Sequence, residues 1–154
     1  MTDVTVIGIR CGRSFDEIME HFLGMGGDAI LMDPEQVCGR DHILSAVMHA
    51  ERAFERNSNR SRTLPTETIL YAAGERQISK ALAKMRPKDG CNEMVAAVFG
   101  LEDLRLENID AVADDMILRC TEEKIRGLGL NVFSGIPCED LVLEMVAAMD
   151  MQKH

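Results

Sequence analysis

The stretch ILYAAGERQISKAL, residues 69–82, decides how the middle of the chain folds, because a single glycine separates two segments with helical patterns. Leu64–Ala73 follows Thr63, a plausible N-cap, and has a proline in its first turn, where a missing N–H is harmless. Gln77–Met85 repeats apolar residues at helical spacing. The pattern predicts two helices with Gly74 as the stop between them. The apolar positions assigned to the core are Ile69, Leu70, Ala81 and Leu82.

Three short apolar segments on either side of this stretch favour β-strands. They are Val4–Arg10, Ala29–Met32 and Met94–Phe99. A helix is predicted after the first of them, because Ser14 and Glu17 have the spacing of a capping box. Further helices are predicted over 35–56 and 114–126, and a last one opens at Pro137. With 154 residues, we expect one domain, 1–154, that mixes helices and strands.

The composition indicates a soluble protein. No apolar run is long enough to cross a bilayer, and the N-terminal MTDVTVIGIR lacks the features of a signal peptide. We therefore expect a cytoplasmic protein without a membrane partner.

Five cysteines are widely spaced, with no CxxC pair and no zinc-ligand spacing. They are Cys11, Cys38, Cys91, Cys120 and Cys138, and we expect them to be reduced and mostly buried. Cys11 and Cys138 lie beside loop-forming residues, so a small cytosolic thiol-dependent enzyme remains an alternative.

No other group of residues assembles an active site. Neither GxxxxGK[ST] nor GxGxxG occurs, which argues against a nucleotide-binding loop. His42 and His49 are seven residues apart on one expected helix, too far for one metal ion, and we expect both on the helix surface. The sequence predicts no catalytic residue, no metal and no cofactor.

The charge of the chain is distributed unevenly. The formal net charge is −9, yet residues 52–88 hold nine cations and three acids, which gives +6 there and −9 − 6 = −15 elsewhere. An acidic chain repels nucleic acid on average, but this basic segment does not. Solvated helix faces are the simpler explanation of the same charges.

The basic segment could form a binding surface. The polar loop 57–62 and the turn 74–77 flank one element, so their cations share a face if its neighbours fold back antiparallel. Arginines and lysines would neutralise phosphates, while Asn59 and Gln77 could read base edges or ribose hydroxyls. Aromatic residues for stacking are scarce, so Ile78 and arginine planes would replace them.

Four stretches of the chain resemble one family. The run RTLPTE (62–67) continuing through ILYAAGERQISKAL, the opening IGIRCGR, the segment LMDPEQVCGRDHILSAVMHAERAF and the closing LVLEMVAAMDMQK are similar to the Cgi/TPRKB (PRPK-binding protein) family, in its archaeal form. Members are the smallest regulatory subunits of the KEOPS tRNA-modifying complex. The resemblance spans nearly the whole chain, in order, and implies an α+β fold with a small, mainly antiparallel sheet surrounded by helices.

The resemblance also implies a non-enzymatic function. Family members bind and stimulate the atypical kinase/ATPase subunit of KEOPS and engage the 3′ CCA end of tRNA during threonylcarbamoyladenosine formation; the threonylcarbamoyl transferase subunit is an indirect partner. The predicted tRNA-binding residues are Asn59, Arg60, Arg62, Gly74, Arg76, Gln77, Ile78, Lys80 and Lys84. The predicted kinase-binding residues, on the last helix, are Leu141, Val142, Met145 and Met149. An interaction module without RNA contact remains the other alternative.

Overall fold

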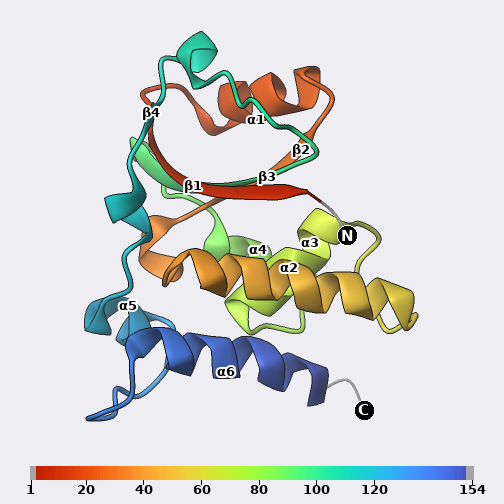
Figure 1. The fold of residues 1–154 in the computed structure, drawn as a ribbon, viewed down its shortest axis with the longest axis vertical. Coiled ribbons are helices and arrows are strands. Elements are labelled where there is room, and N and C mark those ends of the chain that lie inside the picture. Colours follow the sequence, from red (N-terminus) through yellow and green to blue (C-terminus); the bar gives the residue numbers. More distant parts are fainter. Residues whose placement is uncertain (1–2, 152–154) are drawn as a thin grey trace.

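The computed structural model describes residues 3–151, and Figure 1 shows how its elements are arranged. The strands are β1 (Val4–Arg10), β2 (Asp28–Met32), β3 (Glu93–Phe99) and β4 (Val112–Ala113). The α-helices are α1 (Phe15–Gly24), α2 (Arg40–Glu55), α3 (Leu64–Ala73), α4 (Ile78–Met85), α5 (Glu122–Gly127) and α6 (Cys138–Met151). Three 3-10 helices connect them: η1 (Pro34–Gln36), η2 (Leu106–Ile109) and η3 (Asp115–Leu118).

The four strands form one antiparallel sheet in the order β2-β3-β1-β4. Strand β3 lies in the middle against β1 and β2, with Val6 opposite Ala97 and Ile30 opposite the same residue. Neighbouring residues of β1 point to opposite faces, so Val6 and Ile9 join two different apolar clusters. The predicted α+β fold with a small antiparallel sheet is confirmed.

Helices cover both faces of the sheet in layers, as Figure 1 shows. Helix α1 and η2 cover one face, around buried Ile18 and Phe22. Helices α2 and α3 cover the other face, around Ile43 and Tyr71. Helix α6 lies on the far side of α2, so it forms an outer layer that packs on α2 rather than on the sheet.

The predicted helix boundaries around residues 14 and 74 are confirmed. Ser14 caps α1 in a full capping box with Glu17. Thr63 caps α3 by accepting a hydrogen bond from the backbone N–H of Thr66 at 3.3 Å. Gly74 ends α3 in the left-handed conformation, with φ +65°, which glycine adopts without strain.

Strand β4 covers only the end of β1, because it pairs with Ile9 and Arg10 alone. Beyond it, a hollow of about 330 Å³ borders residues 4–7 of β1. The Arg40 side chain reaches into this region and donates from Nε to the carbonyl oxygen of Val6 at 3.0 Å. Its guanidinium also forms an ion pair with Asp115 at 3.1 Å.

Two predicted helices are shorter than their patterns indicated. The segment 35–56 begins as η1, and α2 starts only at Arg40, because Gly39 has φ +93° and Val37 is extended. The segment 114–126 divides into η3 and α5, because Arg119 has a non-helical ψ of 128° and the N-cap Thr121 is extended. Both interruptions flank a cysteine.

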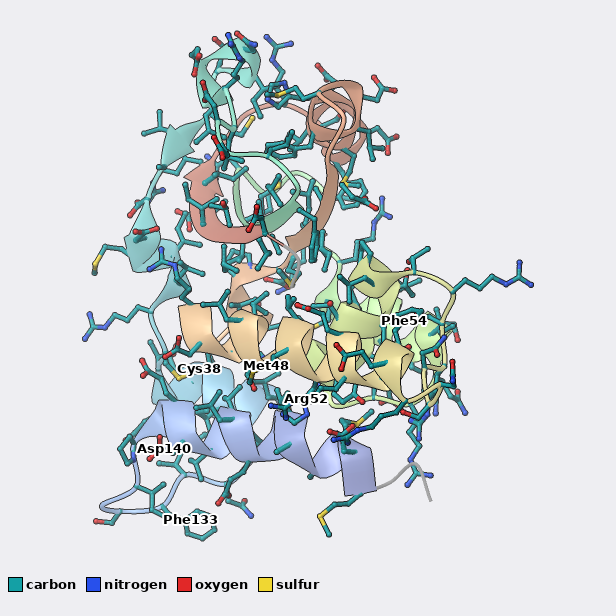
Figure 2. The ribbon with its side chains drawn as sticks, turned by 45° about the vertical axis from the view of Figure 1, so that its right-hand side comes forward. Cys38, Met48, Arg52, Phe54, Phe133 and Asp140 are labelled. Atoms are coloured by element: carbon teal, nitrogen blue, oxygen red, sulfur yellow. A yellow bond between two sulfur atoms is a disulfide. The ribbon has the colours of Figure 1, made fainter. Side chains whose placement is uncertain are left out.

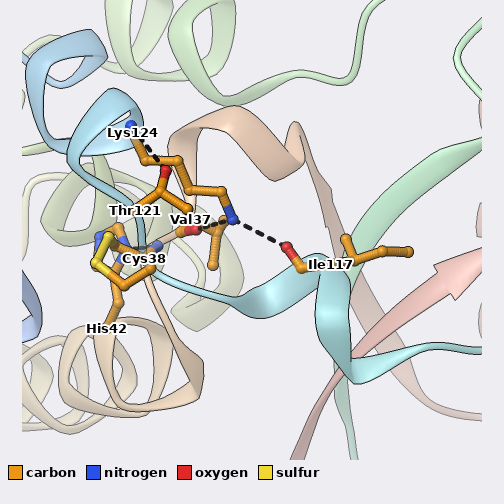
Figure 3. Close-up of a disulfide and its surroundings, with 7 residues drawn as sticks. Val37, Cys38, His42, Ile117, Thr121 and Lys124 are labelled. Atoms are coloured by element: carbon orange, nitrogen blue, oxygen red, sulfur yellow. Dashed lines mark hydrogen bonds between the residues drawn. A yellow bond between two sulfur atoms is a disulfide. The ribbon is translucent and has the colours of Figure 1, made fainter.

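Those two cysteines, Cys38 and Cys120, form a disulfide, so the prediction that all five are reduced is wrong. Their separation of 82 residues hid the pairing from sequence reasoning. Figure 3 shows the disulfide beside Lys124, whose ammonium donates to the carbonyl oxygens of Val37 and Ile117, both at 2.9 Å. Burial lowers the pKa of Lys124. Together these contacts fix α5 to the start of α2.

No helix within residues 3–151 has both the length and the apolar character needed to span a bilayer.

Candidate functional site

The polar loop 57–62 is folded around the buried carboxylate of Glu67, which sequence reasoning did not single out. The Glu67 side chain is 0% exposed, and its Oε1 accepts from the backbone N–H of Arg60 at 2.9 Å and of Ser61 at 2.8 Å. The Ser61 hydroxyl donates to the same oxygen at 3.0 Å. Asn59 donates from its side-chain amide to the carbonyl of Ser61 at 2.8 Å. Arg62, at the end of the loop, is exposed.

The turn after α3 places most of its predicted residues on the surface. Arg76, Gln77 and Lys80 are exposed, and Ile78 is 37% exposed although it has the helical spacing of a core residue. Lys84, another of the predicted tRNA-binding residues, is less exposed than these. Its half-buried ammonium donates to the carbonyl oxygen of Ala73 at 2.9 Å, near the C-terminus of α3. Burial lowers the Lys84 pKa, so this lysine has a structural contact of its own.

The loop and the turn do not form one cluster, because they lie at opposite ends of α3. Helix α3 has ten residues and is therefore about 15 Å long. The sequence allowed the two groups of cations to share a face if the neighbours of α3 fold back antiparallel. The structure instead provides two basic positions joined by a helix, a spacing that an extended polyanion could bridge and a single phosphate could not.

The predicted kinase-binding residues are mostly in the interior. Leu141, Val142 and Met149 are 7%, 0% and 1% exposed, and Met145 is half-buried. Their apolar pattern reflects packing against α5 and α2, so they are not available as a surface. The exposed positions of α6 follow a different stripe, at spacings of three and four residues: Asp140, Glu144, Ala147 and Met151.

The surface beside this stripe is partly apolar. The loop between α5 and α6 carries Phe133 and Ile136, which are 53% and 46% exposed. Figure 2 shows Phe133 pointing away from the body of the protein below α6. The resemblance assigned the last helix to the kinase, and the sequence alone did not show which side of that helix faces the core.

Helix α6 is tied to the elements that carry the basic residues. Asp150 accepts from the Tyr71 hydroxyl on α3 and contacts His49 Nδ1 on α2 at 2.6 Å. The side chain of Met145 lies against Gly74, so close that a Cβ at Gly74 would be 2.9 Å from its Cγ. Helix α6, predicted to bind the kinase, therefore packs directly on α3, whose two ends carry the predicted RNA-binding residues.

Both histidines of α2 were predicted on the helix surface; the prediction is wrong for His42, and His49 is only partly exposed. His42 is 1% exposed and accepts at Nδ1 from the N–H of Cys38 at 3.0 Å, while Nε2 lies 2.8 Å from the carbonyl oxygen of Ala72. This pattern assigns the proton to Nε2. Burial lowers the pKa of His42 to about 4, so the ring is neutral. His49 is largely enclosed by its contact with Asp150.

The residues of the thiol-enzyme alternative do not form a catalytic arrangement. Cys11 is buried, with its Sγ 3.2 Å from the carbonyl oxygen of Ile109, and Cys138 starts α6. Among residues 3–151, no hydrogen bond joins either thiol to a histidine, and no group of three or more histidine, cysteine or acidic side chains could hold a metal ion.

One residue that was assigned to the core, Leu82, lies on the surface instead. Its side chain is 43% exposed, on the rim of a hollow beside α1.

Comparison with models of known protein families shows a match. The family model described as kinase binding protein CGI-121 matches residues 16–130. The matched region starts in α1 and ends just after α5, so it includes the loop around Glu67 and the basic turn, and it leaves α6 outside. No curated protein matches the chain.

Proposed function

Because this chain belongs to the family of kinase binding protein CGI-121, we propose that it is a non-catalytic regulatory subunit of a KEOPS-type tRNA-modifying complex. In this proposal it binds and stimulates the atypical kinase/ATPase subunit and helps recruit tRNA through the 3′ CCA end. The observation that carries the proposal is the family match, which covers both predicted RNA-binding segments.

The kinase-binding part of the proposal is moved from the buried to the exposed stripe of α6. The stripe combines two acids with Ala147 and Met151, next to the exposed Phe133. Such a surface suits a partner with apolar and basic side chains, since apolar contacts supply affinity and complementary charges direct association.

Charge reversal on the exposed stripe is expected to weaken kinase binding. Glu144→Arg places a cation where the proposed partner is basic, so we expect at least about a tenfold rise in the Kd, measured by calorimetry with the purified kinase. The matched control is Glu20→Arg, an identical change at an exposed position of α1 on the other side of the sheet. Equal affinity of both variants and the wild type would remove α6 from the proposal.

The RNA-binding part is supported by the exposed basic turn. Arg76 and Lys80 lie on an otherwise acidic molecule, with the amide of Gln77 and the apolar Ile78 between them. Cations can position a phosphate chain, and amide and aliphatic groups can contact bases. A small basic patch suits a subunit that touches only one end of a tRNA.

Reversing two charges in this turn is expected to weaken tRNA binding. Arg76→Glu with Lys80→Glu should raise the Kd by about tenfold or more and reduce the salt dependence by roughly one unit for each phosphate that the variant no longer neutralises. Electrophoretic binding of full-length tRNA measures this change. The control is Arg119→Glu with Arg126→Glu, an equal change of charge at two exposed arginines next to and within α5.

Binding of tRNA that lacks its CCA end measures how much of the affinity comes from that end. If the 3′ end carries the affinity, tRNA trimmed of CCA should bind the wild type as weakly as intact tRNA binds the double variant. Equal affinity for trimmed and intact tRNA would contradict recruitment through the CCA end. Undetectable binding of both would favour an interaction module without RNA contact.

A further inference from the structure

The loop 57–62 has an unusual anchor for a segment without apolar residues. A buried carboxylate normally loses hydration that must be replaced by hydrogen bonds. Glu67 receives three such bonds on one oxygen, and these three donors belong to two consecutive residues of the loop, Arg60 and Ser61. These bonds tie Arg60 and Ser61 of the loop to α3.

Helix α3 does not need Glu67 for its own N-terminus. Thr63 already accepts from the backbone N–H of Thr66, and Pro65 has no N–H to satisfy. The backbone N–H of Glu67 donates to the carbonyl of Thr63 within the helix. The three bonds to the carboxylate thus serve the loop, and the position of this acid in the first turn also suits the helix dipole.

We infer that Glu67 is a positioning residue of the RNA-binding surface: it fixes the backbone of 60–61 and so presents the exposed Arg62 at one end of α3. This inference rests on the proposed function. A flexible arginine loses conformational freedom when it binds phosphate, and a loop fixed in advance reduces that loss. A carboxylate that is fully enclosed can hold the loop without facing the polyanion.

The direction in which Glu67→Gln changes the Kd for tRNA distinguishes a positioning role from a simple charge effect. Glu67→Gln removes one negative charge, which by electrostatics alone would strengthen RNA binding. It also replaces a charged acceptor by a neutral amide oxygen, whose hydrogen bonds to the three donors are weaker, so the loop should loosen. If Glu67 positions the loop, the Kd of Glu67→Gln for tRNA should be about three- to tenfold higher than that of the wild type, despite the more favourable charge. The matched control, Glu55→Gln, removes the same charge from an exposed position just before the loop and should leave the Kd equal or lower.

Hydrogen exchange of the Arg60 and Ser61 amides provides the readout that does not depend on RNA. Both amides should exchange at least about tenfold faster in Glu67→Gln than in Glu55→Gln, while the amides of α2 and α3 keep their protection. Ser61→Ala removes one donor without changing the buried charge, and it should shift exchange and Kd in the same direction by less. If Glu67→Gln does not fold, the exchange rates and the Kd of Ser61→Ala test the positioning role.

The outcomes separate this inference from the function on which it rests. If the wild type binds tRNA, and Glu67→Gln binds as well as Glu55→Gln or Ser61→Ala leaves exchange unchanged, the positioning role is wrong and the proposed function stands. If the wild type does not bind tRNA, the proposed RNA function and the positioning role both fail, whatever the exchange rates show.

Discussion

Loss of the Cys38–Cys120 disulfide is expected to lower the free energy of unfolding by about 4 kcal/mol, more than any other change predicted for this protein. The bond closes a loop of 82 residues, and the chain-entropy estimate for a loop of that length is about 4.5 kcal/mol. The apolar cluster that it joins is small: its buried members are Cys38, Ile125, Leu128, Leu141 and Val142. Few other contacts can compensate.

Denaturant unfolding of the wild type, with and without reductant, measures this effect. The double variant Cys38→Ala with Cys120→Ala should match the reduced wild type and should not respond to reductant. The denatured, unreduced wild type should show three reactive thiols, since Cys11, Cys91 and Cys138 are free. Five reactive thiols, or identical stability in both conditions, would contradict the assignment.

Acidification should destabilise the protein through His42, by about 3 kcal/mol in total. The imidazole ring has a pKa of about 4 in the folded state, compared with an ordinary value of 6.5. Between these two values the ring is protonated in the unfolded chain and neutral in the folded chain. The contribution of His42 to the free energy of unfolding is therefore fully present above about pH 7, and it is lost as the pH falls toward about 4. Burial is the main cause of the low pKa, and the nearby Lys84 and Lys124 ammonium groups lower it further.

His42→Gln isolates this contribution from that of the carboxylates. Glutamine keeps an N–H donor for the carbonyl of Ala72 but cannot be protonated, so the stability of the variant relative to the wild type should rise by about 3 kcal/mol as the pH falls from about 7 to about 4. Free energies of unfolding measured across this range check the prediction. A constant difference between the two proteins at all pH values would show that His42 does not titrate on unfolding.

The sequence predicted the parts of the fold that depend on local patterns. Apolar strands, the capping box at Ser14 and the glycine stop at Gly74 are all confirmed, because each is determined within a few residues. Elements broken by distant contacts were predicted poorly. Residues 37–39 and 119–121 leave the helical conformation where the disulfide joins them, and helical spacing alone does not contain that information.

The candidate site was predicted as regions better than as residues. Charge counting found the basic segment, and most of its arginines and lysines are exposed. Three of the four residues of α6 that were assigned to the kinase are buried, because the sequence does not reveal which side of this helix meets the core. Glu67 was missed as an anchor because an acid among cations looks like an ordinary surface charge. The RNA contacts of individual residues and the archaeal resemblance remain predictions.

Arg40 also has a consequence for how this protein behaves at high concentration. Within the described residues, the side of β1 that faces away from β3 has no neighbouring strand along residues 4–7, and such an open margin invites strands of other molecules to add to it. A guanidinium on the Val6 carbonyl occupies the hydrogen-bonding position that an incoming strand would need, and it presents a charge that such a strand would have to bury. The Arg40–Asp115 pair is therefore expected to oppose the pairing of β1 with a strand of another molecule.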